Sequence, residues 1–123
     1  MIIRLEPLNG IFDIEKIKKY IETFPFTFQD PIDSHVYLLC RNKVSEEYCR
    51  QERMNSKPYP YVGLVYLQPN LISINHLCGE EEFAQCRKFV EWIVKQYSCK
   101  ITDDYGNDWT EQCKENVDVL YKG

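Results

Sequence analysis

The clearest pattern in the sequence is an amphipathic helix over residues 80–97, EEEFAQCRKFVEWIVKQY. At about 100° per residue, its apolar side chains fall on one side of the helix. These side chains belong to Phe83, Cys86, Val90, Ile93, Val94 and Tyr97. Trp92 projects from the opposite, polar side, so either another segment covers it or it faces solvent and a partner. The apolar stripe itself requires a second structural layer to pack against.

A strand and a second helix are predicted at the N-terminus. The strand is MIIRLEP, and the turn-forming pair Asn9-Gly10 follows it. Asp13 is a good N-cap for a helix that Pro25 ends. The apolar stripe of this helix consists of Ile14, Ile17, Ile21 and Phe24.

The middle of the chain is rich in strand-forming residues. A loop or short edge strand is predicted over residues 24–33, and a strand over residues 35–42. The segments YVGLVYL and LISINHL form a hairpin around Gln68-Pro69-Asn70. In this hairpin Ile72 and Ile74 point to the core, whereas Ser73 and Asn75 point away from it.

Two further segments are interpreted less directly. Residues 43–57 are polar and highly charged and show no apolar stripe, so they are predicted to be a solvated excursion, within which Ser45 could cap a short helix. After the long helix, SCKITDD is predicted as a strand and VDVLY as a possible last strand.

The predicted order of elements is β-α-β-β-β-α-β, with a possible eighth element. Right-handed crossovers would place both amphipathic helices on one face of a mainly antiparallel sheet. We therefore predict a single α+β domain over residues 1–123, a ferredoxin-like or related two-layer sandwich. A chain of 123 residues with 44% apolar content is long enough to bury one such core.

The charge balance restricts the class of partner. Fifteen Lys and Arg residues against 19 Asp and Glu residues give a net charge of −4. Phosphate binding needs clustered positive charge, so nucleic acid is not expected and basic partners are favoured. The sequence has no run of about 18 apolar residues and no export signal at its start, so we expect a cytoplasmic protein without a membrane partner.

The six cysteines are expected to be reduced thiols, because the cytoplasm disfavours disulfides. They are Cys40, Cys49, Cys78, Cys86, Cys99 and Cys113. None of them forms a CxxC pair, and their spacings match no familiar zinc pattern, so no metal site is predicted.

No catalytic residue and no cofactor are predicted. The chain has two histidines, His35 and His76, and lacks a glycine-rich phosphate loop, a GxSxG motif and an HExxH motif. His76 is expected at the margin of the core. The alternative is a small enzyme or ligand-binding domain that uses His76 with Cys78 or Cys86.

An acidic segment with two aromatic residues follows the long helix. Its acids outnumber Lys100 and Lys114 and leave a local charge of −3 over residues 99–115. They are Asp103, Asp104, Asp108, Glu111 and Glu115, and Tyr105 and Trp109 lie among them. A solvated acidic surface is one interpretation. The other is a docking patch for a cationic partner, in which carboxylates steer the partner and rings supply buried area.

The helix FVEWIVKQY running into CKITDDYGNDWT, in a short acidic α+β chain, resembles small bacterial immunity proteins that neutralise secreted or contact-delivered toxins. This resemblance implies a non-enzymatic inhibitor that binds and blocks a cognate, basic toxin domain in the cytoplasm. The partner-binding residues that we expect are Asp103, Asp104, Tyr105, Asp108, Trp109 and Glu111, followed by Trp92, Tyr59 and Tyr61. A further alternative is a structural or regulatory subunit that dimerises through an open sheet edge.

Overall fold

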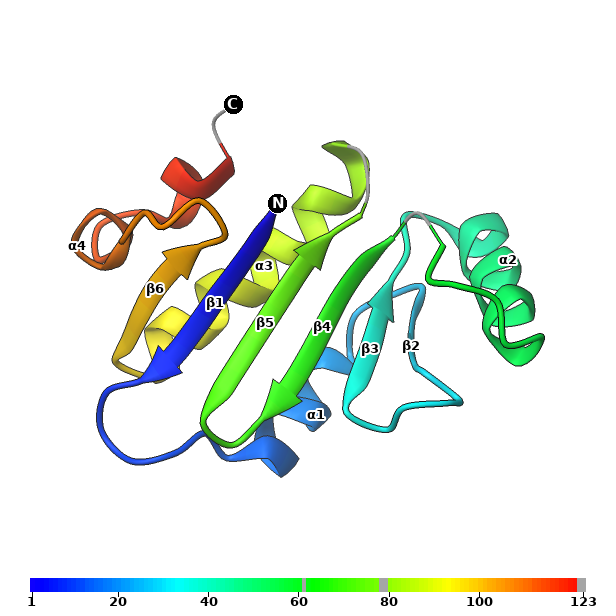
Figure 1. Cartoon of the computed structure of the whole chain (residues 1–123), viewed down its shortest axis with the longest axis horizontal. Coiled ribbons are helices and arrows are strands. Elements are labelled where there is room, and N and C mark those ends of the chain that lie inside the picture. The colour runs from blue at the N-terminus through cyan, green and yellow to red at the C-terminus, as the bar shows by residue number, and fades with distance from the viewer. Residues whose placement is uncertain (61, 78–79, 122–123) are drawn as a thin grey trace.

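A six-stranded antiparallel sheet forms the centre of the structure (Figure 1). The structure is a computed structural model that describes residues 1–60, 62–77 and 80–121, with side chains described throughout except at residues 80–83. The strands are β1 (Ile2–Pro7), β2 (Thr27–Gln29), β3 (Val36–Leu39), β4 (Gly63–Gln68), β5 (Leu71–His76) and β6 (Cys99–Asp103). Their order in the sheet is β2-β3-β4-β5-β1-β6.

The predicted α+β class with a mainly antiparallel sheet is confirmed. The four strands β6-β1-β5-β4 have the order of a ferredoxin-like sheet, and β2 and β3 extend that sheet at one side. The β4-β5 hairpin turns at Pro69 and Asn70, as predicted. Ile72 and Ile74 are buried, whereas Ser73 and Asn75 on the other face are half-buried.

The two predicted amphipathic helices, α1 (Ile14–Ile21) and α3 (Glu80–Gln96), cover the same face of the sheet (Figure 1). The Asp13 side chain caps α1 by accepting a hydrogen bond of 3.2 Å from the backbone N–H of Lys16. Ile17 of α1 and Ile93 of α3 share one buried cluster with Ile3, Leu5, Val65 and Ile74 of the sheet. Phe89, absent from the predicted stripe, is also fully buried in this cluster.

A third helix, α2 (Lys43–Met54), packs on the opposite face near β3 and β4. The prediction of a solvated excursion was therefore wrong. Asn42, and not Ser45, caps α2, because its side chain accepts a 2.8 Å hydrogen bond from the Ser45 N–H. The helix buries only Cys49 and Arg53, which lie one turn apart, so it shows no apolar stripe in the sequence.

The buried arginine of α2 is paired with an aspartate that follows β2. Arg53 donates from Nε to Oδ1 of Asp30 at 3.2 Å and from Nη2 to Oδ2 at 2.9 Å. The Asp30 side chain is fully buried and that of Arg53 is 8% exposed. Arg53 also donates to the Lys57 carbonyl, and the hydrogen bond with Asp30 raises its pKa. This two-bond pair holds α2 beside β2, in addition to the apolar contact that Cys49 makes.

The segment VDVLY is a 3-10 helix, η1 (Val117–Tyr121), and not the last strand that the sequence suggested. Val117 and Leu120 are buried three residues apart, which is the spacing of one 3-10 turn. A short helix, α4 (Thr110–Cys113), precedes it. Arg87 of α3 pairs with Asp118 of η1 at 2.9 Å, so the C-terminal segment packs against α3.

Candidate functional site

The loop after β6 is organised by one carboxylate, that of Asp103. Its Oδ1 accepts hydrogen bonds from the backbone N–H of Tyr105 at 2.9 Å and of Asn107 at 3.0 Å. Its Oδ2 accepts from Nδ2 of Asn107 at 3.0 Å and from the indole Nε1 of Trp109 at 2.9 Å. Asp103 is 8% exposed, and the bonds from Trp109 and Asn107 lower its pKa to about 2. The carboxylate of Asp103 thus accepts four hydrogen bonds from within its own loop.

The same loop closes the free edge of the sheet at β6. The Trp109 N–H donates to the Ile101 carbonyl at 2.8 Å, and the Ile101 N–H donates to Oγ1 of Thr110 at 3.0 Å. Asp108 accepts from the backbone N–H and the hydroxyl of Thr110, which lowers its pKa. These bonds satisfy backbone groups that an edge strand otherwise offers to another chain. The outer edge of β6 is therefore already hydrogen-bonded, which disfavours dimerisation through this edge.

Four predicted contact residues lie on the outer side of this loop, and we call them the acidic loop surface: Asp104, Tyr105, Asp108 and Glu111. Tyr105 is 79% exposed, and all three acids are exposed. Asp104 accepts a 3.2 Å hydrogen bond from the Ile2 N–H, and Glu111 pairs with Lys114 at 2.9 Å in solvent. One ring and three carboxylates are therefore exposed between residues 104 and 111.

Trp109 is half-buried and packs against the main apolar cluster. Together with Asp103 it lies beneath the acidic loop surface and holds the loop in place. Asp103 was predicted as a contact residue because it is one of the five acids of this segment, and Trp109 because it lies among those acids. Their internal hydrogen bond depends on the loop conformation, which residue type and spacing do not reveal.

The remaining predicted contact residues lie elsewhere. Trp92 stacks on Tyr20 of α1, with ring centroids 4.1 Å apart and planes at 10°, so another segment covers one of its faces. Tyr59 packs on the α2 side of the sheet beneath Arg53, whose guanidinium is 4.0 Å from the ring centroid. Burial raises the pKa of Tyr59. Tyr61 lies outside the described residues.

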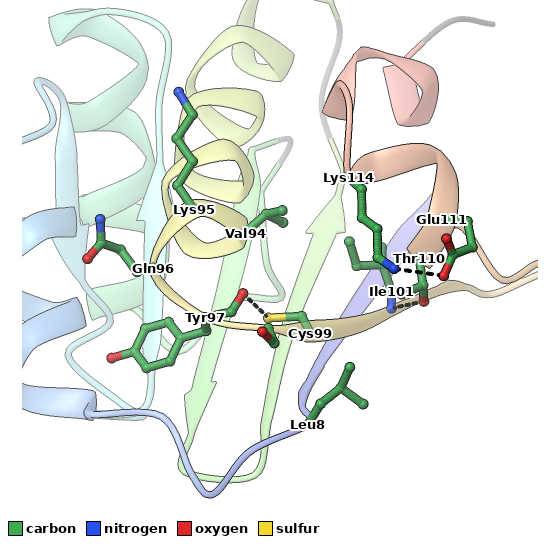
Figure 2. A pocket seen from close by; sticks show the side chains of 11 residues that line it. Leu8, Val94, Lys95, Gln96, Tyr97, Cys99, Ile101, Thr110, Glu111 and Lys114 are labelled. Atoms are coloured by element: carbon green, nitrogen blue, oxygen red, sulfur yellow. Dashed lines mark hydrogen bonds and ion pairs between the residues drawn. The ribbon is translucent and has the colours of Figure 1, made fainter.

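A pocket of about 370 Å³ opens beside the acidic loop surface (Figure 2). Leu8, Val94, Cys99 and Ile101 supply apolar walls from three separate segments of the chain, because Cys99 and Ile101 both belong to β6. Thr110, Glu111 and Lys114 supply polar groups to the pocket, whereas the ends of the Lys95 and Gln96 side chains extend away from it (Figure 2). A pocket of this kind can accept an apolar side chain from a partner. Sequence reasoning missed it, because residues so far apart in the chain carry no common local pattern.

His76, the histidine of the alternative enzymatic interpretation, is buried beside the N-terminus. Its Nδ1 lies 3.1 Å from the Met1 carbonyl and its Nε2 lies 3.2 Å from the Tyr121 hydroxyl. Because the carbonyl can only accept, Nδ1 carries the proton and Nε2 accepts from Tyr121. Burial lowers the pKa of His76 to about 4, so the ring is neutral at pH 7.

The described cysteines are buried, and two of them lie near the acidic loop surface, Cys99 in the wall of the adjacent pocket and Cys113 in α4. Cys40, Cys49, Cys86, Cys99 and Cys113 are buried and free of disulfides, and Cys78 lies outside the described residues. Burial raises the pKa of Cys99 and of Cys113 to about 11. Within the described ranges, no three His, Cys, Asp or Glu side chains are placed to hold a metal ion.

No helix in the described part of the chain has the length and apolar character needed to cross a membrane. In comparisons with known proteins, no family model, no curated protein and no solved structure matches this chain.

Proposed function

We propose that this protein is a non-enzymatic binding module, an immunity protein that binds and blocks a cognate basic toxin domain through the acidic loop surface. The proposal places it in the cytoplasm, where it would meet the toxin domain directly. The observation that carries the proposal is the display of Tyr105, 79% exposed, among Asp104, Asp108 and Glu111 on a loop held by Asp103.

The first physical argument concerns the aromatic ring. An exposed tyrosine contributes a large contact area with few rotatable bonds, so little conformational entropy is lost when it is buried. The loop beneath Tyr105 is already ordered by the hydrogen bonds to Asp103. Binding therefore does not have to order this segment, which lowers the free energy cost of association.

The second argument concerns charge. Three exposed carboxylates attract a basic domain and accelerate its encounter with the loop, although surface charges add less to the final affinity. Once the complex forms, burial of Tyr105 and of a partner side chain in the adjacent pocket would slow dissociation. In this arrangement Asp103 and Trp109 support the loop. Trp92 and Tyr59 lie away from it, and the expected contact at Tyr61 stays a prediction.

The experiment is a calorimetric titration of this protein with the C-terminal domain of the polypeptide that is encoded beside it in the genome. Asp104→Lys with Glu111→Lys reverses two exposed charges. Neither side chain takes part in the hydrogen bonds of the Asp103 carboxylate, so these bonds stay intact. Glu15→Lys with Glu47→Lys is the matched control, because both side chains are exposed on helices α1 and α2.

We expect the native chain to bind, the loop variant to bind about tenfold or more weakly, and the control to stay within about twofold. The absence of binding by the native chain contradicts the proposal. Equal weakening in the two variants contradicts it as well, because the effect would then come from net charge and not from the acidic loop surface.

A further inference from the structure

A second exposed surface with the opposite charge lies along the contact between α1 and α3. We call it the helix seam and define it as Lys16, Lys19, Tyr20, Lys88, Trp92 and Lys95. At its centre the Tyr20 and Trp92 rings stack with centroids 4.1 Å apart. Tyr20 also meets Phe24 edge-on, with centroids 5.2 Å apart. The stacking of Tyr20 on Trp92 therefore joins the two helices.

The stacked pair remains partly open to solvent. Tyr20 and Trp92 are both half-buried, and a hollow of about 240 Å³ lies over them, lined also by Lys88, Glu91 and Lys95. Large aromatic side chains that are left partly exposed side by side are typical of contact surfaces.

The helix seam contains four lysines, and one acid, Glu91, lines the hollow over the stacked pair, so the local charge is positive although the whole chain carries −4. Lys95 pairs with Glu91 at 2.9 Å, and this pair lowers the pKa of Glu91. Lys16 donates to the Gln96 side chain at 3.2 Å and lies 5.9 Å from the centroid of the Trp92 ring. Among the described residues, no carboxylate lies within ion-pair distance of Lys16, Lys19 or Lys88.

The helix seam and the acidic loop surface share no residue, although Lys95 of the seam also lines the pocket beside Glu111. Trp92 projects from α3 toward α1, whereas Arg87 and Val94 project toward the C-terminal segment that contains α4 and η1. The protein therefore carries two surfaces of opposite charge on the two sides of α3. A basic partner suits the acidic loop surface, whereas an acidic partner suits the helix seam.

We propose that the helix seam is a second docking surface, and that its occupant is an acidic peptide segment of a partner protein. The carboxylates of the segment would meet Lys16, Lys19 and Lys88, and an apolar side chain would cover the open part of the Tyr20–Trp92 pair. The charge complementarity of the seam selects an acidic occupant.

The geometry favours a peptide over a single-stranded nucleic acid. Proteins that bind single-stranded nucleic acids stack the bases on the free faces of aromatic side chains. Tyr20 covers one face of the Trp92 indole, and the Lys16 ammonium lies over the ring. The part of the indole left open suits an apolar side chain better than a stacked base.

The test uses Trp92 as its own fluorescent reporter. The Trp109→Phe variant leaves Trp92 as the one tryptophan in the chain. It is titrated with a short synthetic peptide of Glu-Glu-Leu repeats, with the Gln-Gln-Leu twin of that peptide, and with oligothymidylate. Amide chemical shifts of the native chain, measured with the same three probes, provide a second readout that does not depend on the Trp109 substitution.

We expect a saturable change in Trp92 emission with the acidic peptide and binding at least about fivefold weaker with the neutral twin. Lys16→Gln with Lys88→Gln should weaken binding about fivefold. Lys57→Gln with Lys100→Gln, two exposed lysines outside the helix seam, should change it less than about twofold.

Three results would overturn the proposal. The first is a lack of saturable change with the acidic peptide in both readouts. The second is equal weakening by the two pairs of lysine substitutions, which would mean a general charge effect. The third is tighter binding of oligothymidylate than of the acidic peptide, which would assign the helix seam to nucleic acid.

Discussion

The indole Nε1 of Trp109 donates a 2.9 Å hydrogen bond to Oδ2 of Asp103, across the loop that follows β6. The same carboxylate accepts two bonds from Asn107 and one from the Tyr105 backbone. One side chain thus joins the last strand, the exposed tyrosine and the half-buried tryptophan. The conformation of the acidic loop surface depends on Asp103, although Asp103 is not exposed there.

Asp103→Asn should loosen the loop while leaving the sheet folded. The amide is nearly the same size as the carboxylate, but one acceptor oxygen becomes a donor NH₂ facing the donors of Asn107 and Trp109. We expect a red shift of Trp109 emission in a Trp92→Phe background and faster amide exchange over residues 104–108. A variant with unchanged emission and exchange would show that Asp103 does not organise the loop.

Burial of neutral His76 should make stability fall as the pH falls from about 6.5 to about 4. The folded pKa of His76 is lowered to about 4, so below pH 6.5 the unfolded chain binds a proton that the native protein does not. The loss should reach about 3 kcal/mol near pH 4. Urea unfolding at a series of pH values measures it, and His76→Gln should reduce the slope in this window. An equal slope in the variant would contradict the assignment.

The Asp30–Arg53 pair should be strongly coupled. Truncation of either partner leaves a buried charge without its counterion, so Arg53→Ala should cost about 3–5 kcal/mol of unfolding free energy. Asp30→Ala with Arg53→Ala should cost less than the sum of the single variants, because no unpaired charge remains. Denaturant unfolding of the four proteins measures the coupling. Additive single effects would mean that the pair does not hold α2.

Gly63 should be required by the close approach of α3 to β4. A Cβ added at Gly63 would lie 2.6 Å from Sγ of Cys86. Gly63→Ala should therefore destabilise the fold by about 1–3 kcal/mol. Cys86→Ala removes the sulfur and should recover part of this loss in the double variant. Thermal unfolding tests this, and a double variant as unstable as the sum of the singles would contradict it.

The sequence was sufficient to predict those helices and strands whose buried residues follow a regular spacing. Apolar residues at helical spacing predicted α1 and α3, and alternation in LISINHL predicted the direction of Ile72 and Ile74. It was insufficient for α2, whose buried side consists of Cys49 and Arg53. Arg53 can be buried because Asp30 neutralises its charge. That pairing joins residues far apart in the chain, so no local pattern reports it.

For the candidate site, residue type indicated the acidic and aromatic character of residues 103–111 but not the roles within it. The distinction between Asp103, held inside the loop, and Asp104, displayed outside it, arises from the backbone path after β6. The adjacent pocket arises because the fold brings Leu8 to the same hollow as residues of α3, β6 and α4. Neither property follows from composition.

The central claim is that Tyr105 anchors a basic toxin domain, and the most direct test is the dissociation constant for the domain encoded by the neighbouring gene. Tyr105→Ala is compared with Tyr48→Ala, a matched change at a tyrosine of α2 that is 58% exposed. The account predicts that Tyr105→Ala weakens binding about thirtyfold and that Tyr48→Ala changes it less than about twofold. Equal affinities of the Tyr105→Ala variant and the native chain would contradict the account.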